Sequence, residues 1–120
     1  MRSIKVAMCQ IFSLDGDRSG NFVRIENAIG EAKDAGADIV CLPETAILGW
    51  VNPDAHKRAR PIQGEDSDQL CKLAGDYDLH LCACLAEKEG RRLYDSVVTV
   101  RPGGELDDED VLDGKVIGLV

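Results

Sequence analysis

Aromatic side chains are scarce in this chain of 120 residues, where one Trp, two Tyr and two Phe make up 4% of the sequence. The hydrophobic residues amount to 44% of the chain and are mainly Val, Ile, Leu, Ala and Cys. This composition favours helices and strands layered around an aliphatic core, and it argues against an aromatic platform for stacking bases. The length is that of one domain, so two autonomous domains are not expected.

Basic residues are fewer than acidic ones, with 14 Lys and Arg against 22 Asp and Glu, which gives a net charge of -8. Such a balance repels a phosphate backbone, so no nucleic-acid binding is expected. Much of the acidity is local, because six of the acidic residues lie close together near the C-terminal end. They are Glu105, Asp107, Asp108, Glu109, Asp110 and Asp113.

Long apolar runs and paired cysteines are missing as well. No run approaches the roughly 18 residues that span a bilayer, and the N-terminal residues lack the apolar core of a signal peptide. We therefore expect a cytoplasmic protein without membrane contact. The cysteines are odd in number and show no CxxC spacing, which is typical of reduced, buried thiols. They are Cys9, Cys41, Cys71, Cys82 and Cys84.

Hydrophobic periodicity predicts a strand, a helix and a second strand in the first third of the chain. A mostly apolar run over 4–12 predicts a largely buried strand, and helical spacing from Asn21 to a stop at Gly36 predicts a helix. The short apolar run over 38–42, which Pro43 ends, predicts a parallel strand buried on both faces. These segments form a βαβ unit.

The remaining patterns predict a long loop, a second helix and an antiparallel pair of strands. Residues 45–64 should form a loop with one short helix, and a helix should follow up to Tyr77, with Asp66 and Gln69 as a start that resembles a capping box. Further segments are strands over 79–85 and 93–100 around a polar turn over 87–90, and an edge strand over 116–120. The helices should lie on one face of a mixed sheet, because right-handed crossovers keep them together.

The residue that stands out chemically is Glu44, directly after the second predicted strand. Functional groups gather at the carboxyl ends of parallel strands, and we expect burial there to raise the pKa of its carboxyl and to suit it to proton transfer. Taken alone, such a glutamate could equally be a helix cap, a salt-bridge partner or a solvated loop residue.

Several short motifs occur in a consistent order along the chain. They are Gln10 at the end of the first strand, the turn from Asp17 to Asn21, the string Gly-Ala-Asp-Ile-Val-Cys-Leu-Pro-Glu over 36–44, Gly49-Trp50, Pro61-Ile62-Gln63-Gly64, Glu87-Lys88-Glu89-Gly90, Leu93-Tyr94-Asp95-Ser96 and Pro102-Gly103-Gly104. Together these landmarks, from about 4 to 106, resemble the nitrilase superfamily of carbon-nitrogen hydrolases.

The resemblance implies a fold and a chemistry. Family members are α-β-β-α sandwiches, so this α/β chain would be the N-terminal half, a mixed sheet with helices on one face. They hydrolyse amides, nitriles or carbamoyl compounds with a Glu-Lys-Cys set, which makes Glu44 the general base and small molecules of this kind the expected substrates. No cofactor and no metal are expected.

The C-terminal end departs from the family pattern. Where an Arg-Lys stretch should supply the catalytic lysine, this chain has acidic residues over 107–110, and Lys115 stands in a context that does not match. The nucleophilic cysteine would follow later still. We therefore expect an incomplete hydrolase domain over 1–106 with a divergent acidic tail over 107–120, truncated and inactive by itself. A non-catalytic remnant or interaction module with half of the fold is the alternative.

Other readings of single residues are weaker. Cys82, Cys84 and His80 share one face of a strand and could bind a metal, but core and edge positions explain them better. Asp15 and Asp17 could be a metal pair or the acids of a receiver-like signalling domain, yet they lie too far into a loop and are typical of turns. Lys57, Arg58 and Arg60 could attract an anionic substrate or simply be solvated.

A half sandwich has one further consequence. The sheet face that a second sheet normally covers should be bare and apolar, and such a surface promotes self-association into a homo-oligomer.

Overall fold

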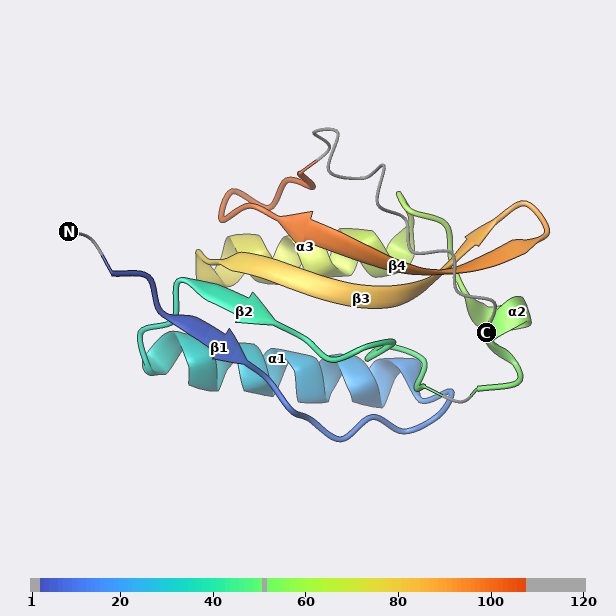
Figure 1. Cartoon of the computed structure of the whole chain (residues 1–120), viewed down its shortest axis with the longest axis horizontal. Helices are drawn as coiled ribbons and strands as arrows, with labels where there is room; N and C mark the ends of the chain where they lie inside the picture. Colours follow the sequence, from blue (N-terminus) through green and yellow to red (C-terminus); the bar gives the residue numbers. More distant parts are fainter. Residues whose placement is uncertain (1–2, 51, 108–120) are drawn as a thin grey trace.

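The computed structural model describes residues 3–50 and 52–107, which form four strands and three helices (Figure 1). In chain order they are β1 (Val6–Met8), α1 (Arg18–Asp34), β2 (Ile39–Cys41), α2 (Ala55–Arg58), α3 (Glu65–Tyr77), β3 (His80–Glu89) and β4 (Arg92–Val100). This order confirms the predicted succession of strands and helices, including the short helix in the long loop.

The four strands form one mixed sheet in the order β1-β2-β3-β4. β1, β2 and β3 run parallel, and β4 is antiparallel to β3. Figure 1 shows α1 and α3 side by side behind the sheet. Both crossovers therefore have the same hand, and the prediction that the two long helices share one face is confirmed.

The core lies between the sheet and these two helices. Ile25 and Ile29 of α1 fall one helical turn apart, and both are fully buried together with Leu70 of α3. Val40 of β2 and Leu81 of β3 are neighbours across the parallel pair and face the same layer. The aliphatic composition of the sequence thus packs as one layer of strands against one layer of helices.

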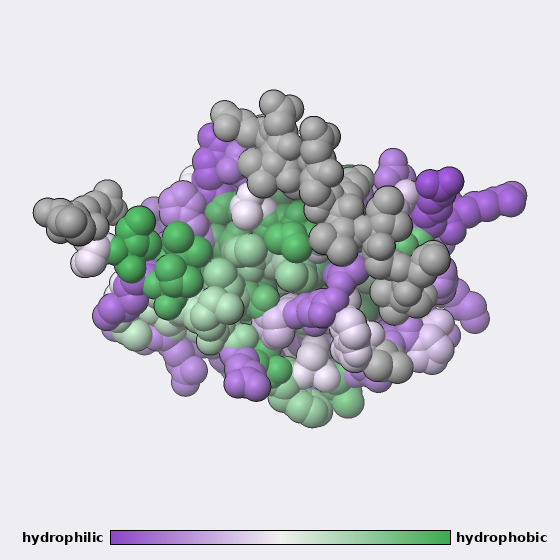
Figure 2. Space-filling model, viewed as in Figure 1, coloured by the Kyte–Doolittle hydropathy of each residue, from purple (hydrophilic) through white to green (hydrophobic). Residues whose placement is uncertain are grey.

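Within residues 3–50 and 52–107, no helix or second sheet covers the opposite side of this sheet. The strand register puts alternate residues on this open sheet face, and they include Val6, Met8, Ile39, Cys41, Cys82, Cys84, Asp95 and Val97. Figure 2 shows hydrophobic residues gathered on the side that faces the reader. Val6 is 49% exposed and Met8 is 78% exposed, although both belong to a strand.

The open sheet face corrects one expectation and confirms another. The strands predicted over 4–12 and 38–42 were expected to be buried, the second on both faces, and this is wrong because α1 and α3 lie on one side only. The expected bare, apolar sheet face is confirmed for the described residues.

The antiparallel pair is longer than predicted. Residues 87–90 were expected to form a polar turn, but β3 continues to Glu89 and the chain reverses at Gly90, where φ is +61°. Glu87 stays in the strand because it is buried and accepts a 2.7 Å hydrogen bond from the Ser96 hydroxyl of β4. A buried, partnered carboxyl inside a strand is invisible to a hydropathy pattern.

Both long helices begin where local side chains satisfy their first amides. α1 starts at Arg18, earlier than the Asn21 predicted, since the Asp17 carboxylate accepts from the Gly20 amide and caps the helix. α3 follows Gly64, whose amide donates to the Ser67 hydroxyl. Asp66 is therefore not the cap that the sequence suggested.

Three sequence-based predictions fall outside the described residues: the edge strand over 116–120, Lys115 and the greater part of the acidic tail. Among the residues that the structure does describe, no helix has the length and apolar character needed to span a membrane.

Candidate functional site

Glu44 lies where β2 ends, as predicted. Beyond Cys41, the Leu42 amide still donates to the Cys82 carbonyl at 2.9 Å, which continues the parallel pairing for one residue. Pro43 has no amide hydrogen and cannot extend the ladder. The chain therefore leaves the sheet at Glu44, on the edge where the carboxyl ends of the parallel strands meet.

The residue that follows Glu44 has an unusual backbone. Thr45 has a φ of +47°, a left-handed conformation that is costly for a β-branched residue. It is 2% exposed, and its hydroxyl has no hydrogen-bond partner among the described residues. Strain of this kind, roughly 1–3 kcal/mol, persists where the surroundings fix the backbone, and it concentrates at functional sites.

The segment after Thr45 is anchored in the core. The Gly49 amide donates to the Thr45 carbonyl at 2.8 Å and closes a tight turn, and Ala46, Ile47 and Leu48 inside that turn are all buried. These anchors hold the strained backbone in place, so Glu44 projects from a fixed support rather than from a free loop.

Asn21 ties this support to the loop that follows β1. It is buried in the first turns of α1, accepts a hydrogen bond from the Leu14 amide and donates to the carbonyls of Leu14 and Ile47, at 2.8–2.9 Å. The Ser13 hydroxyl adds a 2.6 Å bond to the Ala46 carbonyl. One amide side chain thus joins both loops at this edge of the sheet.

Replacing Asn21 by Leu is expected to lower the free energy of unfolding by about 2–4 kcal/mol, because three backbone groups, the buried Ile47 carbonyl among them, lose their partners. Urea unfolding of this chain measures the change. Asn27→Leu, on the exposed side of the same helix, serves as the control and should stay within about 0.5 kcal/mol of the native chain. Equal losses of stability in the two variants would show that the Asn21 hydrogen bonds do not stabilise this edge of the sheet.

The Glu44 side chain itself is exposed, so the expectation that it is largely buried is wrong. The reason lies in the layers of the fold. Glu44 lies next to Asp95 of the open sheet face, and α1 and α3 cover only the opposite face. Burial of this carboxylate would require a second layer over the open sheet face.

A second carboxyl, Asp95 of β4, meets Glu44. Burial raises the pKa of Asp95 to about 7, and a hydrogen bond to Glu44 and the charge of Glu44 contribute to the rise. Sequence reasoning missed this residue as a functional candidate. Its signal was the strand alternation, which puts Asp95 on the same face as Cys84, but the approach of Glu44 depends on the register of three strands.

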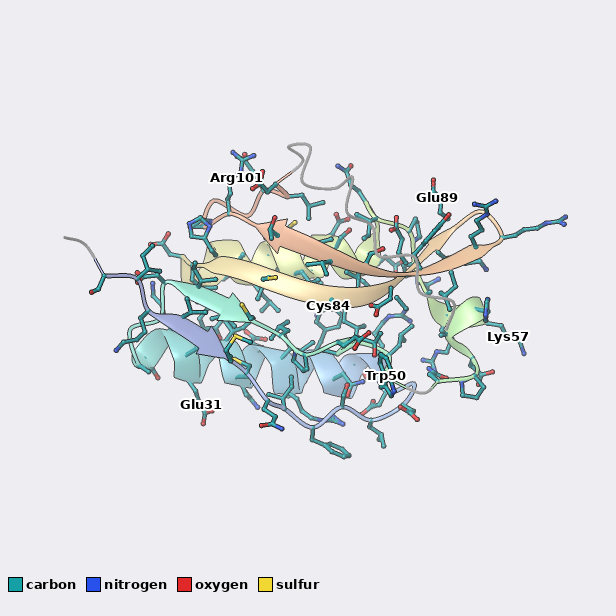
Figure 3. The ribbon with its side chains drawn as sticks, viewed as in Figure 1. Glu31, Trp50, Lys57, Cys84, Glu89 and Arg101 are labelled. Atoms are coloured by element: carbon teal, nitrogen blue, oxygen red, sulfur yellow. The ribbon has the colours of Figure 1, made fainter. Side chains whose placement is uncertain are left out.

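Cys84 lies beside this pair, near the middle of β3 (Figure 3). Burial first, and then the charges of Cys82 and Asp95, raise the pKa of the Cys84 thiol to about 11. The Glu44 carboxylate adds to the rise. A thiol with such a pKa is almost fully protonated at neutral pH and is a poor nucleophile, so Cys84 does not fit the role of attacking group.

The cysteines and His80 do not assemble a metal site within 3–50 and 52–107. No cluster of three His, Cys, Asp or Glu there has suitable positions, and the five cysteines are free. His80 is exposed at the start of β3, next to Ile39 of β2. The cysteines are half-buried rather than fully buried as expected, and three of them, Cys41, Cys82 and Cys84, lie on the open sheet face.

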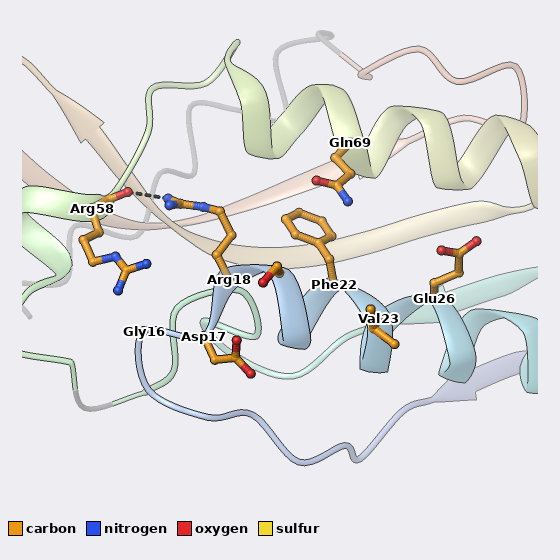
Figure 4. A pocket seen from close by; sticks show the side chains of 9 residues that line it. Gly16, Asp17, Arg18, Phe22, Val23, Glu26, Arg58 and Gln69 are labelled. Carbon is orange, nitrogen blue, oxygen red and sulfur yellow. Dashed lines mark hydrogen bonds between the residues drawn. The ribbon is translucent and has the colours of Figure 1, made fainter.

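Of the basic residues of the long loop, Arg58 lines a separate hollow of about 470 Å³ between α1 and α3 (Figure 4). Arg18, Phe22, Arg58 and Gln69 are among its lining residues, and Glu44 is not. Arg18 donates to the Arg58 carbonyl and to the Asp66 carboxylate across the hollow. The described structure therefore does not join the basic patch to Glu44.

Comparisons with known proteins agree with this architecture. The model of the carbon-nitrogen hydrolase family matches residues 5–115. A nitrilase of Pyrococcus abyssi is 33% identical over 105 residues, which are 84% of this chain and 40% of the relative. An (R)-stereoselective amidase of a Pseudomonas species is 32% identical and is covered to 37%.

Solved structures show the same fold. The Nit3 protein of Saccharomyces cerevisiae, a member of the nitrilase superfamily, has a TM-score of 0.78 at 23% identity, with 88% of this chain and 42% of that chain covered. An amidase from a Nesterenkonia species has a TM-score of 0.76 at 22% identity, with 86% and 40% covered. The chain thus spans about 40% of the length of these relatives.

Proposed function

The chain belongs to the carbon-nitrogen hydrolase family, and we propose that it supplies the general base of a hydrolase for small amides, nitriles or carbamoyl compounds. The observation that carries the proposal is the position of Glu44 at the carboxyl end of β2, on a strained and anchored backbone. The printed names of two relatives, a nitrilase and an amidase, support the substrate class.

In the proposed reaction Glu44 moves protons while a thiolate does the covalent chemistry. Glu44 takes the proton of the attacking thiol as sulfur bonds to the carbonyl carbon of an amide, and it returns that proton to nitrogen as the carbon-nitrogen bond breaks. A water molecule then attacks the thioester carbon while Glu44 accepts its proton, and the carbon-sulfur bond breaks as that proton returns to the sulfur and the carboxylic acid is released. An ammonium group stabilises the negative charge on oxygen in both steps.

The thiolate and the ammonium would come from outside the described residues. The described thiols of Cys9, Cys71, Cys82 and Cys84 all have pKa values raised by burial, which favours the neutral form. We propose that residues 1–106 are the N-terminal part of the hydrolase domain and 107–120 a divergent tail, in a cytoplasmic protein. By itself this chain would then be inactive.

The open sheet face favours a second candidate, an interaction module that binds through this surface without catalysis. Exposed apolar patches on sheets mark contact surfaces, and self-association is one outcome.

A hydrolysis assay tests the proposal. The extended protein is defined as this chain to Asp107, followed by the part of the Pyrococcus abyssi nitrilase beyond the matched region. It should hydrolyse small aliphatic amides or nitriles, with ammonia release as the readout, and the 120-residue chain should not exceed background. A folded extended protein that releases no ammonia from any amide, nitrile or carbamoyl substrate would favour the interaction module.

A further inference from the structure

We propose that Asp95 is a positioning residue for Glu44, and that the two carboxyls share one proton across strand β3. The inference rests on the proposed function for its catalytic meaning. The pairing itself concerns only residues of this chain, and it rests on the strand registers together with the hydrogen bond between Asp95 and Glu44.

The register brings the two carboxyls together. Asp95 lies opposite Ala86 of β3 in the antiparallel pair, on the open sheet face. Glu44 approaches from the other side of β3, since Cys41 pairs with Cys82 and the Leu42 amide extends that ladder. The small side chain of Ala86 leaves room between them, and the carboxyls of Glu44 and Asp95 meet in a hydrogen bond.

A hydrogen bond between two carboxyls requires a proton on one of them, because two adjacent carboxylates repel each other. Asp95 is the better holder of that proton, since burial raises its pKa to about 7 and the charge of Glu44 contributes. Protonated Asp95 then donates its hydrogen bond to the Glu44 carboxyl. The pair carries one negative charge near neutral pH and titrates as a unit.

The groups around the pair are consistent with this assignment. Cys84, on the same face of β3, is held neutral by a pKa of about 11 and brings no counter-charge. Lys88 lies on the same face, two residues along β3 from Ala86, and is opposite Leu93 rather than Asp95. The hydrogen bond from Asp95 would therefore orient the Glu44 carboxyl toward a substrate, in a position where it can act as a base.

The pairing is tested on the 120-residue chain, without reference to activity. Carbon-13 NMR of labelled Asp and Glu carboxyls should give Asp95 a midpoint near pH 7. In Glu44→Gln the midpoint should fall by about one unit or more, because the neighbouring charge is gone. The control Glu31→Gln, on an exposed position of α1, should leave the midpoint unchanged.

An Asp95 midpoint near 4, or one that Glu44→Gln does not move, would overturn the proton-sharing pair. If the Glu44 variant does not fold, the same titration of the native chain and of Asp95→Asn decides, since the signal near pH 7 must vanish in Asp95→Asn.

The catalytic meaning has a separate readout in the extended protein. In the native form, kcat should decline above about pH 7, where Asp95 loses the proton that it donates to Glu44. Asp95→Asn still donates to Glu44 and cannot ionise, so it should keep activity and should not show this decline. Asp95→Leu should lower kcat about tenfold or more with a smaller change in KM. Equal pH profiles in the native and Asn forms would remove the positioning role, even where the NMR titration succeeds. Absence of activity in every form, with the titration as expected, would count against the proposed function alone.

Discussion

Replacing Glu44 by Gln is expected to lower kcat/KM of the extended protein about 10³-fold, within the range attributed to a positioned general base. Gln keeps the size and the hydrogen-bonding atoms of the side chain but cannot take a proton from a thiol or from water. The loss should therefore fall on kcat, with KM changed far less, because substrate contacts are kept. Ammonia release at saturating and at limiting substrate separates the two parameters.

The matched control is Glu31→Gln, which makes the same chemical change on an exposed position of α1, away from the open sheet face (Figure 3). It should retain full activity, and circular dichroism should show the same fold in both variants. Activity in Glu44→Gln above a tenth of the native value would remove Glu44 from the role of general base.

The succession and layering of the elements could be predicted from the sequence because they depend on local periodicity. Ile25 and Ile29 repeat at helical spacing, and the short run around Val40 ends at a proline, so each element could be recognised by itself. Handedness then placed both long helices on one face. None of these steps needs a contact between distant residues.

What could not be predicted depends on pairing at a distance. Asp66 has the form of a helix cap, yet its partner is Arg18, far away in the sequence, and the cap is formed at Gly64 instead. Glu87 looks like a turn residue until the Ser96 hydroxyl on the neighbouring strand is placed within hydrogen-bond distance of its carboxylate.

In the candidate site, too, local features could be predicted from the sequence and long-range contacts could not. Glu44 could be found because it follows a strand and completes a known motif. Its exposure could not be foreseen, since that depends on what covers the open sheet face. Asp95 was missed as a partner because its approach to Glu44 needs the registers of β2, β3 and β4 together. Sequence alternation fixes a face, but not which residue on the next strand lies opposite.

Replacing Arg18 by Met is expected to lower the free energy of unfolding of this chain by about 3 kcal/mol, the low end of what breaking a buried ion pair costs. The Arg18 guanidinium donates to both carboxylate oxygens of Asp66, at 2.9 and 3.2 Å, and also to the Arg58 carbonyl. Asp66 is 2% exposed, so Met would leave its charge buried without a partner. The low end applies because Arg18 keeps 19% of its side chain in solvent.

Two comparisons separate the loss of a buried partner from the loss of any surface charge. Lys72→Met removes the basic member of the exposed Lys72 and Asp76 pair on α3, and it should leave the urea midpoint unchanged. The double variant Arg18→Met with Asp66→Leu should be more stable than Arg18→Met alone, because the stranded carboxylate is then gone and an apolar pair takes its place. If Arg18→Met costs no more than Lys72→Met, or if the double variant recovers nothing, the ion pair does not hold the start of α1 against α3.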